Sequence, residues 1–250
     1  MSDIFNRGLD LFTGIIYRSI TSYPTFMHIK SIFRDEWYNF IIPNVSPDNL
    51  NWDQALSIIN SEKEQGYLLS YYIPDDLFNQ YIKYFKVNSK NENIGSDFYI
   101  AKHIENKYSP IGNLVLVDDT TIQKYVDMAK ICFPEWETNK QYAMHMYEQQ
   151  KINKQLVVRN YLLKHDNNFV GFCGMISSQK NNLAYFHNTG VLPKHRRKGY
   201  FAAIIQHLVN LSIPLGISDT YAIVENESGS YHGLIKLGFI VKDKYHLFST

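Results

Sequence analysis

Two hydrophobic periods alternate along this chain of 250 residues. Apolar side chains three and four residues apart predict helices, whereas alternation at every second residue predicts strands. In the first 110 residues both periods occur, which predicts a mixed α/β region. The expected elements are a helix over 4–19, an extended stretch over 27–42, a helix from 48 to Gly66, a strand over 67–73, a helix from 74 through Phe85 and a strand over 97–104.

A polar segment with one proline and one glycine, residues 107–112, predicts a domain boundary. We therefore expect one domain over 1–110 and a second over 111–250. In the second domain the turn Asp166-Asn167-Asn168 joins two alternating runs into a hairpin. The expected order is a strand at 114–117, helices at 122–133 and 139–150, strands at 155–164, 168–177 and 183–191, a helix beginning near 201, a strand at 220–224, a helix at 228–237 and a strand at 239–248.

Composition narrows the possible functions. A net charge of +1 creates no overall field for nucleic acid or an anionic membrane. No uninterrupted apolar run approaches the roughly 20 residues that span a bilayer. We therefore expect a soluble, cytoplasmic protein that binds neither. The two cysteines, Cys132 and Cys173, and the nine histidines lack the number and spacing of a disulfide framework or a metal site, so we expect no metal.

The segment 191–202 carries the most specific chemistry in the chain. It reads Val-Leu-Pro-Lys-His-Arg-Arg-Lys-Gly-Tyr-Phe-Ala and lies between a strand-like run and a helix-like run. The first amides of a helix have no intrahelical acceptor, and the helix dipole makes that end positive. Such an end binds phosphate groups, and Gly199 would let the main chain approach a ligand closely. The segment therefore predicts a pyrophosphate site.

Three motifs resemble the GCN5-related N-acetyltransferase (GNAT) family. Arg196-x-x-Gly199 is similar to its pyrophosphate-binding signature, and Val191–Pro193 is similar to the strand end that precedes it. Leu234–Phe239, Leu-Ile-Lys-Leu-Gly-Phe, resembles a late family motif. The resemblance covers roughly 112–250 and implies an α/β fold with a mixed, largely antiparallel twisted sheet flanked by helices. It also implies that the smaller N-terminal α/β lobe is a truncated companion, as in two-lobed members.

Two positions depart from the family pattern. Phe201 stands where the signature has glycine or alanine, which puts close approach to the last loop amide in question. Leu234 stands where many relatives have a tyrosine that protonates the leaving thiolate, so this role is not carried over. Tyr231, one helical turn earlier, is the next candidate for it. Tyr200 and Ser228 are weaker ones.

The resemblance also implies how the cofactor is held. The strand 183–191 is expected to separate from its neighbour and bind the pantetheine arm, with an oxyanion held by a strand amide near Gly190 or Val191. Gly190 fits a bulge or a close approach. The cofactor-binding residues that we expect are Thr189, Gly190, Val191, Arg196, Arg197, Lys198, Gly199, Tyr200, Phe201 and Asn226.

Acetyl transfer to an amine requires an unprotonated nucleophile and a nearby base. Alternation places Tyr185, His187 and Thr189 on one face of their strand. His187 is the best candidate base, because an ordinary histidine titrates near neutral pH. A structural histidine is the alternative. Glu135 and Glu137 could bind a cationic acceptor, but the favoured interpretation for both is a solvated loop charge.

These expectations define an acetyl-CoA-dependent N-acetyltransferase with acetyl-CoA as co-substrate. An amine would attack the thioester directly within a ternary complex. No covalent acyl-enzyme is expected, because neither cysteine has a base beside it in the sequence pattern. The alternative is a catalytically inactive CoA-binding or regulatory module. Nucleic-acid binding through the basic turn is a further alternative, which the nearly neutral charge disfavours.

Overall fold

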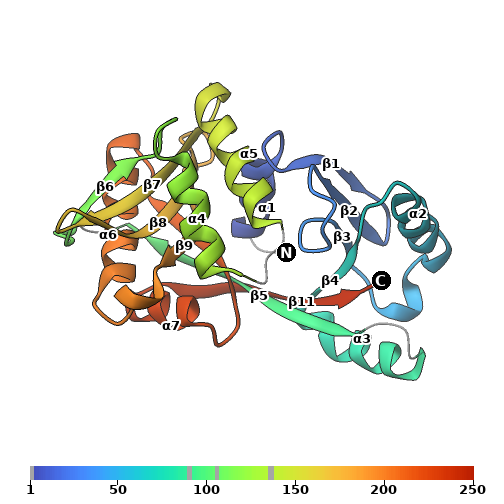
Figure 1. The fold of residues 1–250 in the computed structure, drawn as a ribbon. Coiled ribbons are helices and arrows are strands. Elements are labelled where there is room, and N and C mark those ends of the chain that lie inside the picture. The colour runs from blue at the N-terminus through green and yellow to red at the C-terminus, as the bar shows by residue number, and fades with distance from the viewer. Residues whose placement is uncertain (1–2, 89–91, 105–106, 135–137) are drawn as a thin grey trace. The chain divides into compact units, whose positions relative to one another are not determined.

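The structure is a computed structural model that describes residues 3–88, 92–104, 107–134 and 138–250 (Figure 1). Its helices are α1 Asp3–Phe12, α2 Trp52–Glu64, α3 Asp75–Asn88, α4 Ile122–Cys132, α5 Asn139–Ile152, α6 Tyr200–Ser212 and α7 Gly229–Lys236. Its strands are β1 Tyr17–Ser22, β2 Phe26–Ser31, β3 Phe40–Pro43, β4 Ser70–Pro74, β5 Asn93–His103, β6 Asn113–Leu116, β7 Val157–His165, β8 Asn168–Ser178, β9 Leu183–Val191, β10 Asp219–Glu225 and β11 Ile240–Ser249.

The chain divides into two compact units. The N-terminal unit comprises Met1–Tyr99, Val224–Ser228 and Val241–Thr250, and the C-terminal unit comprises Ile100–Ile223 and Gly229–Ile240. Strands β5, β10 and β11 contribute residues to both units. Each unit is α/β with a mixed, largely antiparallel sheet and flanking helices, as predicted. The proposed division into domains at residue 110 stays a prediction.

In the N-terminal unit the strand order is β1-β2-β3-β4-β11-β5. Only β3 and β4 run parallel among the pairings described there. The predicted helix over 4–19 is wrong beyond Phe12, because Gly14 takes a left-handed conformation (φ 81°) and turns the chain into β1. The extended stretch 27–42 is two strands separated by a loop. Gly66 (φ 80°) follows the end of α2 as predicted.

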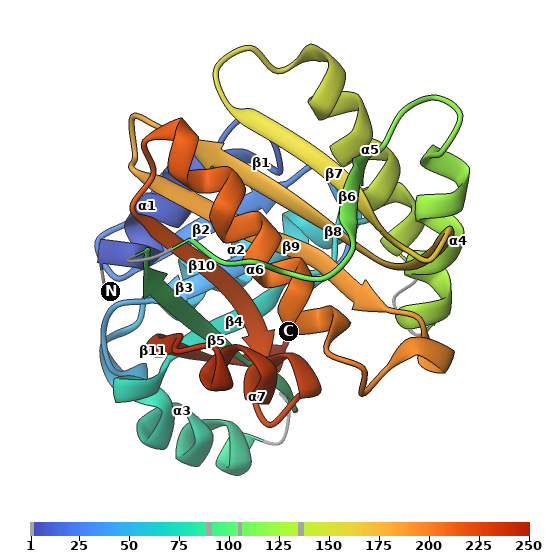
Figure 2. The same cartoon turned by 90° about the vertical axis from the view of Figure 1, so that its left-hand side faces the viewer.

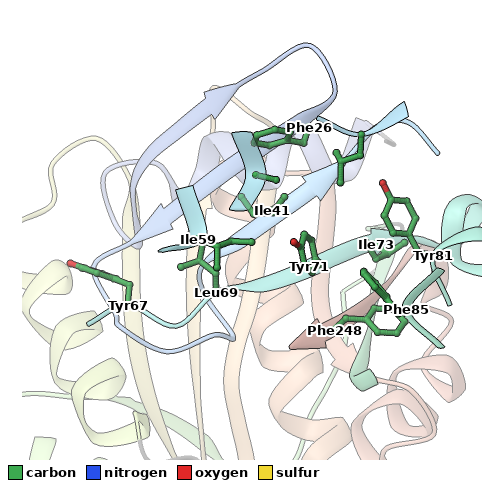
Figure 3. Packing of buried hydrophobic residues seen from close by; sticks show 12 residues of the cluster. Phe26, Ile41, Ile59, Tyr67, Leu69, Tyr71, Ile73, Tyr81, Phe85 and Phe248 are labelled. Atoms are coloured by element: carbon green, nitrogen blue, oxygen red, sulfur yellow. The ribbon is translucent and has the colours of Figure 1, made fainter. Parts of the chain in front are cut away.

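A hydrophobic core packs against α2 and α3 in this unit (Figure 3). Tyr71, Ile73 and Phe248 extend from β4 and β11 toward Tyr81 and Phe85 of α3, and all five are buried. Their aromatic rings pack in tilted pairs with centroids 4.8–5.7 Å apart. Aromatic side chains bury large apolar areas, so this core uses several of the chain's tyrosines and phenylalanines.

A second group of aromatic rings surrounds a carboxyl group. Tyr72 stacks between Phe40 and Tyr245, with centroids 4.5 Å away on each side. Its hydroxyl donates to Asp97 Oδ2 at 2.9 Å. Burial raises the pKa of Asp97 to about 6; the Tyr72 hydrogen bond opposes this shift and the charge of Glu225 adds to it. The folded N-terminal unit thus binds a proton more tightly than an unfolded chain would.

In the C-terminal unit the strand order is β10-β9-β8-β7-β6. β9 and β10 are parallel, and the other pairs are antiparallel. The predicted hairpin is confirmed: Asp166 and Asn167 have φ of 46° and 60°, the left-handed values of a type I′ turn. Helices α4 and α5 lie on one face of the sheet, and α6 crosses β8 and β9 on the other (Figures 1 and 2).

The protonation of Asp97 predicts how stability depends on pH. The pKa of this carboxyl group is raised from 3.8 in the unfolded chain to about 6 in the folded protein. The free energy of unfolding therefore falls as the pH rises from about 4 to about 6, and the carboxyl group is least favourable to the fold above pH 6. We expect Asp97→Asn to raise the free energy of unfolding at pH 8 by on the order of 1–3 kcal/mol. At pH 4 the variant should match the wild type.

Urea unfolding at the two pH values measures this difference. Asp10→Asn, which removes an exposed carboxyl of α1, is the matched control and should leave the difference between pH 4 and pH 8 unchanged. An Asp97→Asn variant that is equally destabilised at both pH values would contradict the prediction.

Candidate functional site

The segment that joins β9 to α6 is a short exposed loop. Leu192 donates its N–H to Val170 O at 3.0 Å, which fixes the loop to β8. A single 3-10 turn, Pro193–His195, follows. Arg197 and Gly199 then have φ of 62° and 82°, and these two left-handed residues redirect the chain into the first turn of α6. Gly199 is the N-cap residue, and no side chain caps the helix there.

The N-terminus of α6 presents unpaired amides at an open surface. The first helical bond at this end runs from the Ala203 N–H to Gly199 O at 3.0 Å, so the three preceding amides have no acceptor within the helix. Around Gly199, apart from its chain neighbours, no heavy atom of the described residues lies within 4 Å of the position that a Cβ would take. The geometry is that of an anion site at a helix end.

The cationic side chains of this loop differ in what they contact. Arg196 donates from Nε to Val191 O at 3.2 Å, and its guanidinium also interacts with the Cys132 thiol. Arg196 therefore ties the loop to the end of β9. Arg197 and Lys198 are exposed, so their charges are available to a ligand in front of the helix.

The side chains of Tyr200 and Phe201 pack within the unit. Tyr200 is buried, and its hydroxyl lies 3.0 Å from His165 Nδ1 in the β7–β8 hairpin. Phe201 lies against Gly233 of α7, where an added Cβ would come within 2.7 Å of the ring. The bulky residue in the family signature is thus accommodated by a glycine on the neighbouring helix. At the anion site these two residues offer their amides.

Strand β9 separates from β10 midway along its length. Their parallel pairing ends at Tyr221 and Tyr185. Beyond that point β9 continues to pair with β8 as far as Val191. The main-chain groups of 186–191 that face away from β8 therefore have no partner in β10, and N–H and C=O groups on this edge can form hydrogen bonds with an extended ligand.

A bulge interrupts β9 at Asn188. The register with β8 shifts between Gly174, which pairs with His187, and Phe172, which pairs with Gly190. Asn188 has φ 44°, and its side-chain amide donates to Tyr125 Oη at 3.0 Å. The extra residue places His187 and Gly190 on one face. The prediction that Thr189 shares the face of His187 is therefore wrong.

Gly190 and Thr189 have separate roles next to this bulge. A Cβ at Gly190 would lie 2.6 Å from the Phe172 ring and 3.1 Å from Cys132 Cβ, so only glycine allows this close packing. Thr189 donates from its hydroxyl to His187 O at 3.2 Å. Val191, the last residue of the strand, is buried and accepts the hydrogen bond from Arg196.

His187 is buried in an aromatic enclosure. Its ring stacks on Tyr185 and meets Tyr142 of α5 edge-on, both at 5.6 Å between centroids. The side chain is 3% exposed, and neither ring nitrogen has a hydrogen-bond partner among the described residues. Burial lowers the pKa of His187 to about 3. The imidazole is therefore neutral at physiological pH and retains a free lone pair.

The remaining candidate residues are more scattered. Tyr231 is half-buried on α7, with its ring 5.2 Å from that of His232, whereas Leu234 is fully buried. Asn226 belongs to the N-terminal unit, where its N–H donates to Ser96 O at 3.2 Å. Its predicted role at the pantetheine stays a prediction. Glu135 and Glu137 lie outside the described residues.

Neither cysteine is activated as a nucleophile. Burial raises the pKa of the Cys173 thiol far above its ordinary value. Burial also raises the pKa of Cys132, although the neighbouring Arg196 opposes this shift. Both thiols therefore stay protonated at neutral pH, and a protonated thiol attacks thioesters poorly.

Sequence reasoning missed several residues that shape the site. Gly174 makes room for the His187 ring, because a Cβ there would overlap it. Glycine within a strand pattern signals such a close approach. Tyr142 and Asn188 carried no comparable signal, since a helical tyrosine and a strand asparagine fit many roles. In the described parts of the chain, no group of three or more His, Cys, Asp or Glu side chains is placed to hold a metal.

The contact between Phe201 and Gly233 leads to a stability prediction. In a helix, alanine is favoured over glycine by about 1 kcal/mol, but here the new methyl group would collide with the Phe201 ring. We expect Gly233→Ala to destabilise the wild type by on the order of 1 kcal/mol. In a Phe201→Ala background the same substitution should be stabilising by about 0.5–1 kcal/mol. Urea unfolding of all four proteins gives the coupling energy, and equal effects in both backgrounds would refute the contact.

No helix of the described residues is both long and apolar enough to cross a membrane.

No curated protein matches the sequence. Several solved structures share the fold at low identity. One is a conserved protein of unknown function from Staphylococcus epidermidis, which is 14% identical, with 94% of each chain covered and a TM-score of 0.70.

A GCN5-related N-acetyltransferase from Kribbella flavida is 13% identical, with 99% of this chain and 95% of that chain covered and a TM-score of 0.69. A tandem GNAT protein from the clavulanic acid biosynthesis pathway is 11% identical, with 98% and 87% covered and a TM-score of 0.63. These likenesses show the two-lobed fold. The model of the acetyltransferase (GNAT) family matches residues 122–239. The chain is thus a two-lobed protein that matches the GNAT acetyltransferase family over residues 122–239.

Proposed function

We propose that the protein transfers an acetyl group from acetyl-CoA to a primary amine by direct attack. The observation that carries this proposal is the open N-terminus of α6 at Gly199, directly after a strand that does not pair with β10 from Phe186 to Val191. The helix end would hold the pyrophosphate through its amides, with Arg197 and Lys198 adding charge-assisted contacts. The free strand edge would bind the pantetheine amides and direct the thioester toward the bulge.

The bulge at Asn188 supports an oxyanion site. Main-chain N–H groups near Gly190 and Val191 would stabilise the negative oxygen of the tetrahedral intermediate. The leaving thiolate needs a proton, which we assign to the Tyr231 hydroxyl on α7. Because both cysteine thiols are protonated, the acetyl group would pass directly from sulfur to nitrogen, without an acyl-enzyme.

His187 would take the proton from the attacking nitrogen. Its low pKa makes it too weak a base to deprotonate a free ammonium ion at neutral pH. The amine would therefore bind in its neutral form. Once the C–N bond has formed, the nitrogen is more acidic and can pass its proton to the imidazole. On this mechanism the pH dependence of kcat/KM follows the pKa of the acceptor amine, and His187 contributes no inflection between pH 6 and 7.

The cofactor site is tested by a pair of glycine variants. Gly199→Ala and Gly14→Ala both place a methyl group on an open, left-handed residue (φ 82° and 81°), at a cost of roughly 1–2 kcal/mol each. We expect Gly199→Ala alone to weaken CoA binding, by tenfold or more, because its methyl group stands in front of the helix amides. Calorimetric titration with CoA measures this effect. Equal affinity of both variants would argue against the assigned site.

The chemistry is tested with His187→Phe, which keeps a ring in the aromatic enclosure and removes both nitrogens. We expect kcat to fall about 10²–10⁴-fold, with CoA affinity unchanged. Release of free thiol from acetyl-CoA in the presence of a panel of amines follows the reaction. CoA binding by the wild-type protein without thiol release across the panel would instead support a catalytically inactive CoA-binding module.

A further inference from the structure

Tyr67 occupies an unusual place at the edge of the N-terminal core. It follows Gly66, after the end of α2, and is 6% exposed. Figure 3 shows its hydroxyl pointing away from the other labelled core residues. The ring therefore belongs to the core, while its polar end faces a different set of side chains.

Three cationic side chains surround this one tyrosine. Lys30 Nζ lies 4.3 Å from the ring centroid and Arg34 Cζ lies 5.7 Å from it. Arg18 donates from Nη1 to the Tyr67 hydroxyl at 2.9 Å. The residues come from β1, β2 and the loop after β2, so the fold brings them together from separate segments.

Only one of the three cations is neutralised. Lys30 forms an ion pair with Glu62 Oε2 at 2.6 Å and donates to Gln65 Oε1 at 3.1 Å. Across the residues that the structure describes, neither Arg18 nor Arg34 pairs with a carboxylate, although both side chains belong to exposed residues. The cluster therefore keeps two uncompensated guanidinium charges around one ring.

This arrangement is costly unless an anion joins it. Like charges gathered at a protein surface repel one another, because the solvent screens them incompletely. Cation–π contact with the Tyr67 ring offsets part of this repulsion for Lys30 and Arg34. His28, on the same face of β2 as Lys30, is 7% exposed and has no partner for Nε2 among the described residues. The buried Nε2 atom is therefore a further hydrogen-bonding group on the Lys30 face of the strand.

We propose that Arg18, Lys30 and Arg34 around Tyr67 form a binding site for a small dianionic oxyanion of the phosphate type. Two unpaired guanidinium groups match two negative charges, and their planar N–H groups suit the oxygens of phosphate or carboxylate. The site lies wholly within the N-terminal unit, on residues that the proposed acetyl transfer does not use. The proposed anion site therefore does not depend on the proposed acetyl transfer.

The test must distinguish this site from the α6 N-terminus, which also presents amides to phosphate. Inorganic phosphate is titrated by calorimetry into the full chain and into two double variants. Arg18→Gln with Arg34→Gln removes the unpaired charges of the proposed site. Arg197→Gln with Lys198→Gln removes two exposed charges from the loop before α6 and serves as the matched control. We expect phosphate affinity at the proposed site to fall tenfold or more in the first variant and to persist in the control.

The ligand class is tested in the same experiment by replacing phosphate with succinate or acetate. Both dianions should bind at least tenfold more tightly than the monoanion acetate, because two charges are matched instead of one. Equal affinity for acetate would overturn the assignment to dianions.

Two further results would overturn the site itself. One is phosphate binding that the control double variant abolishes and the Arg18/Arg34 variant retains. The other is the absence of phosphate-dependent shifts at the Gly66 and Leu68 amides in NMR spectra of the wild-type protein. The NMR readout does not depend on whether the Arg18/Arg34 variant folds.

Discussion

The structure of the candidate site depends on one change of pairing in the sheet. β9 loses its parallel partner after Tyr185 but keeps its antiparallel partner to Val191. The strand is therefore rigid on one edge and unpaired on the other over the same residues. Rigidity fixes where the following loop begins, and the free edge supplies donors and acceptors. If β9 paired with β10 along its whole length, the N-terminus of α6 would still be open, but no unpaired strand edge would lead to it.

Periodicity and turn chemistry predicted much of this arrangement. Asp166 and Asn167 marked the hairpin because few residues other than asparagine, aspartate and glycine adopt left-handed turns. Most of the order of helices and strands followed from their periods, and the family resemblance sharpened the boundaries. The predicted helix over 4–19 failed because its apolar spacing continued past Gly14, where the backbone turns. Apolar spacing reports which face is buried, and it does not report where the chain reverses.

Details of the site were harder to predict because they depend on tertiary contacts. The bulge at Asn188 changes which side chains share a face. Gly190 indicated a bulge or a close approach in this part of the strand, but not which residue is bulged. The direction of Phe201 depends on Gly233, a residue on another helix. The pKa of His187 depends on enclosure by Tyr142 and Tyr185. Phe201 and His187 were identifiable from the sequence, but their environments required the fold, and Asn188 was not identified from the sequence.

The His187 ring packs directly against Gly174, and this contact restricts the motion of the ring. The imidazole occupies the volume where any larger residue at 174 would place its first side-chain atom, and tyrosine rings confine it further. Such a ring has no room to swing between two rotamers. It is a stationary group, unlike a histidine that shuttles protons by moving. In the proposed acetyl transfer, a molecule that exchanges a proton with this ring has to be delivered to it, so the timing of the reaction would be set by how the amine enters the enclosure.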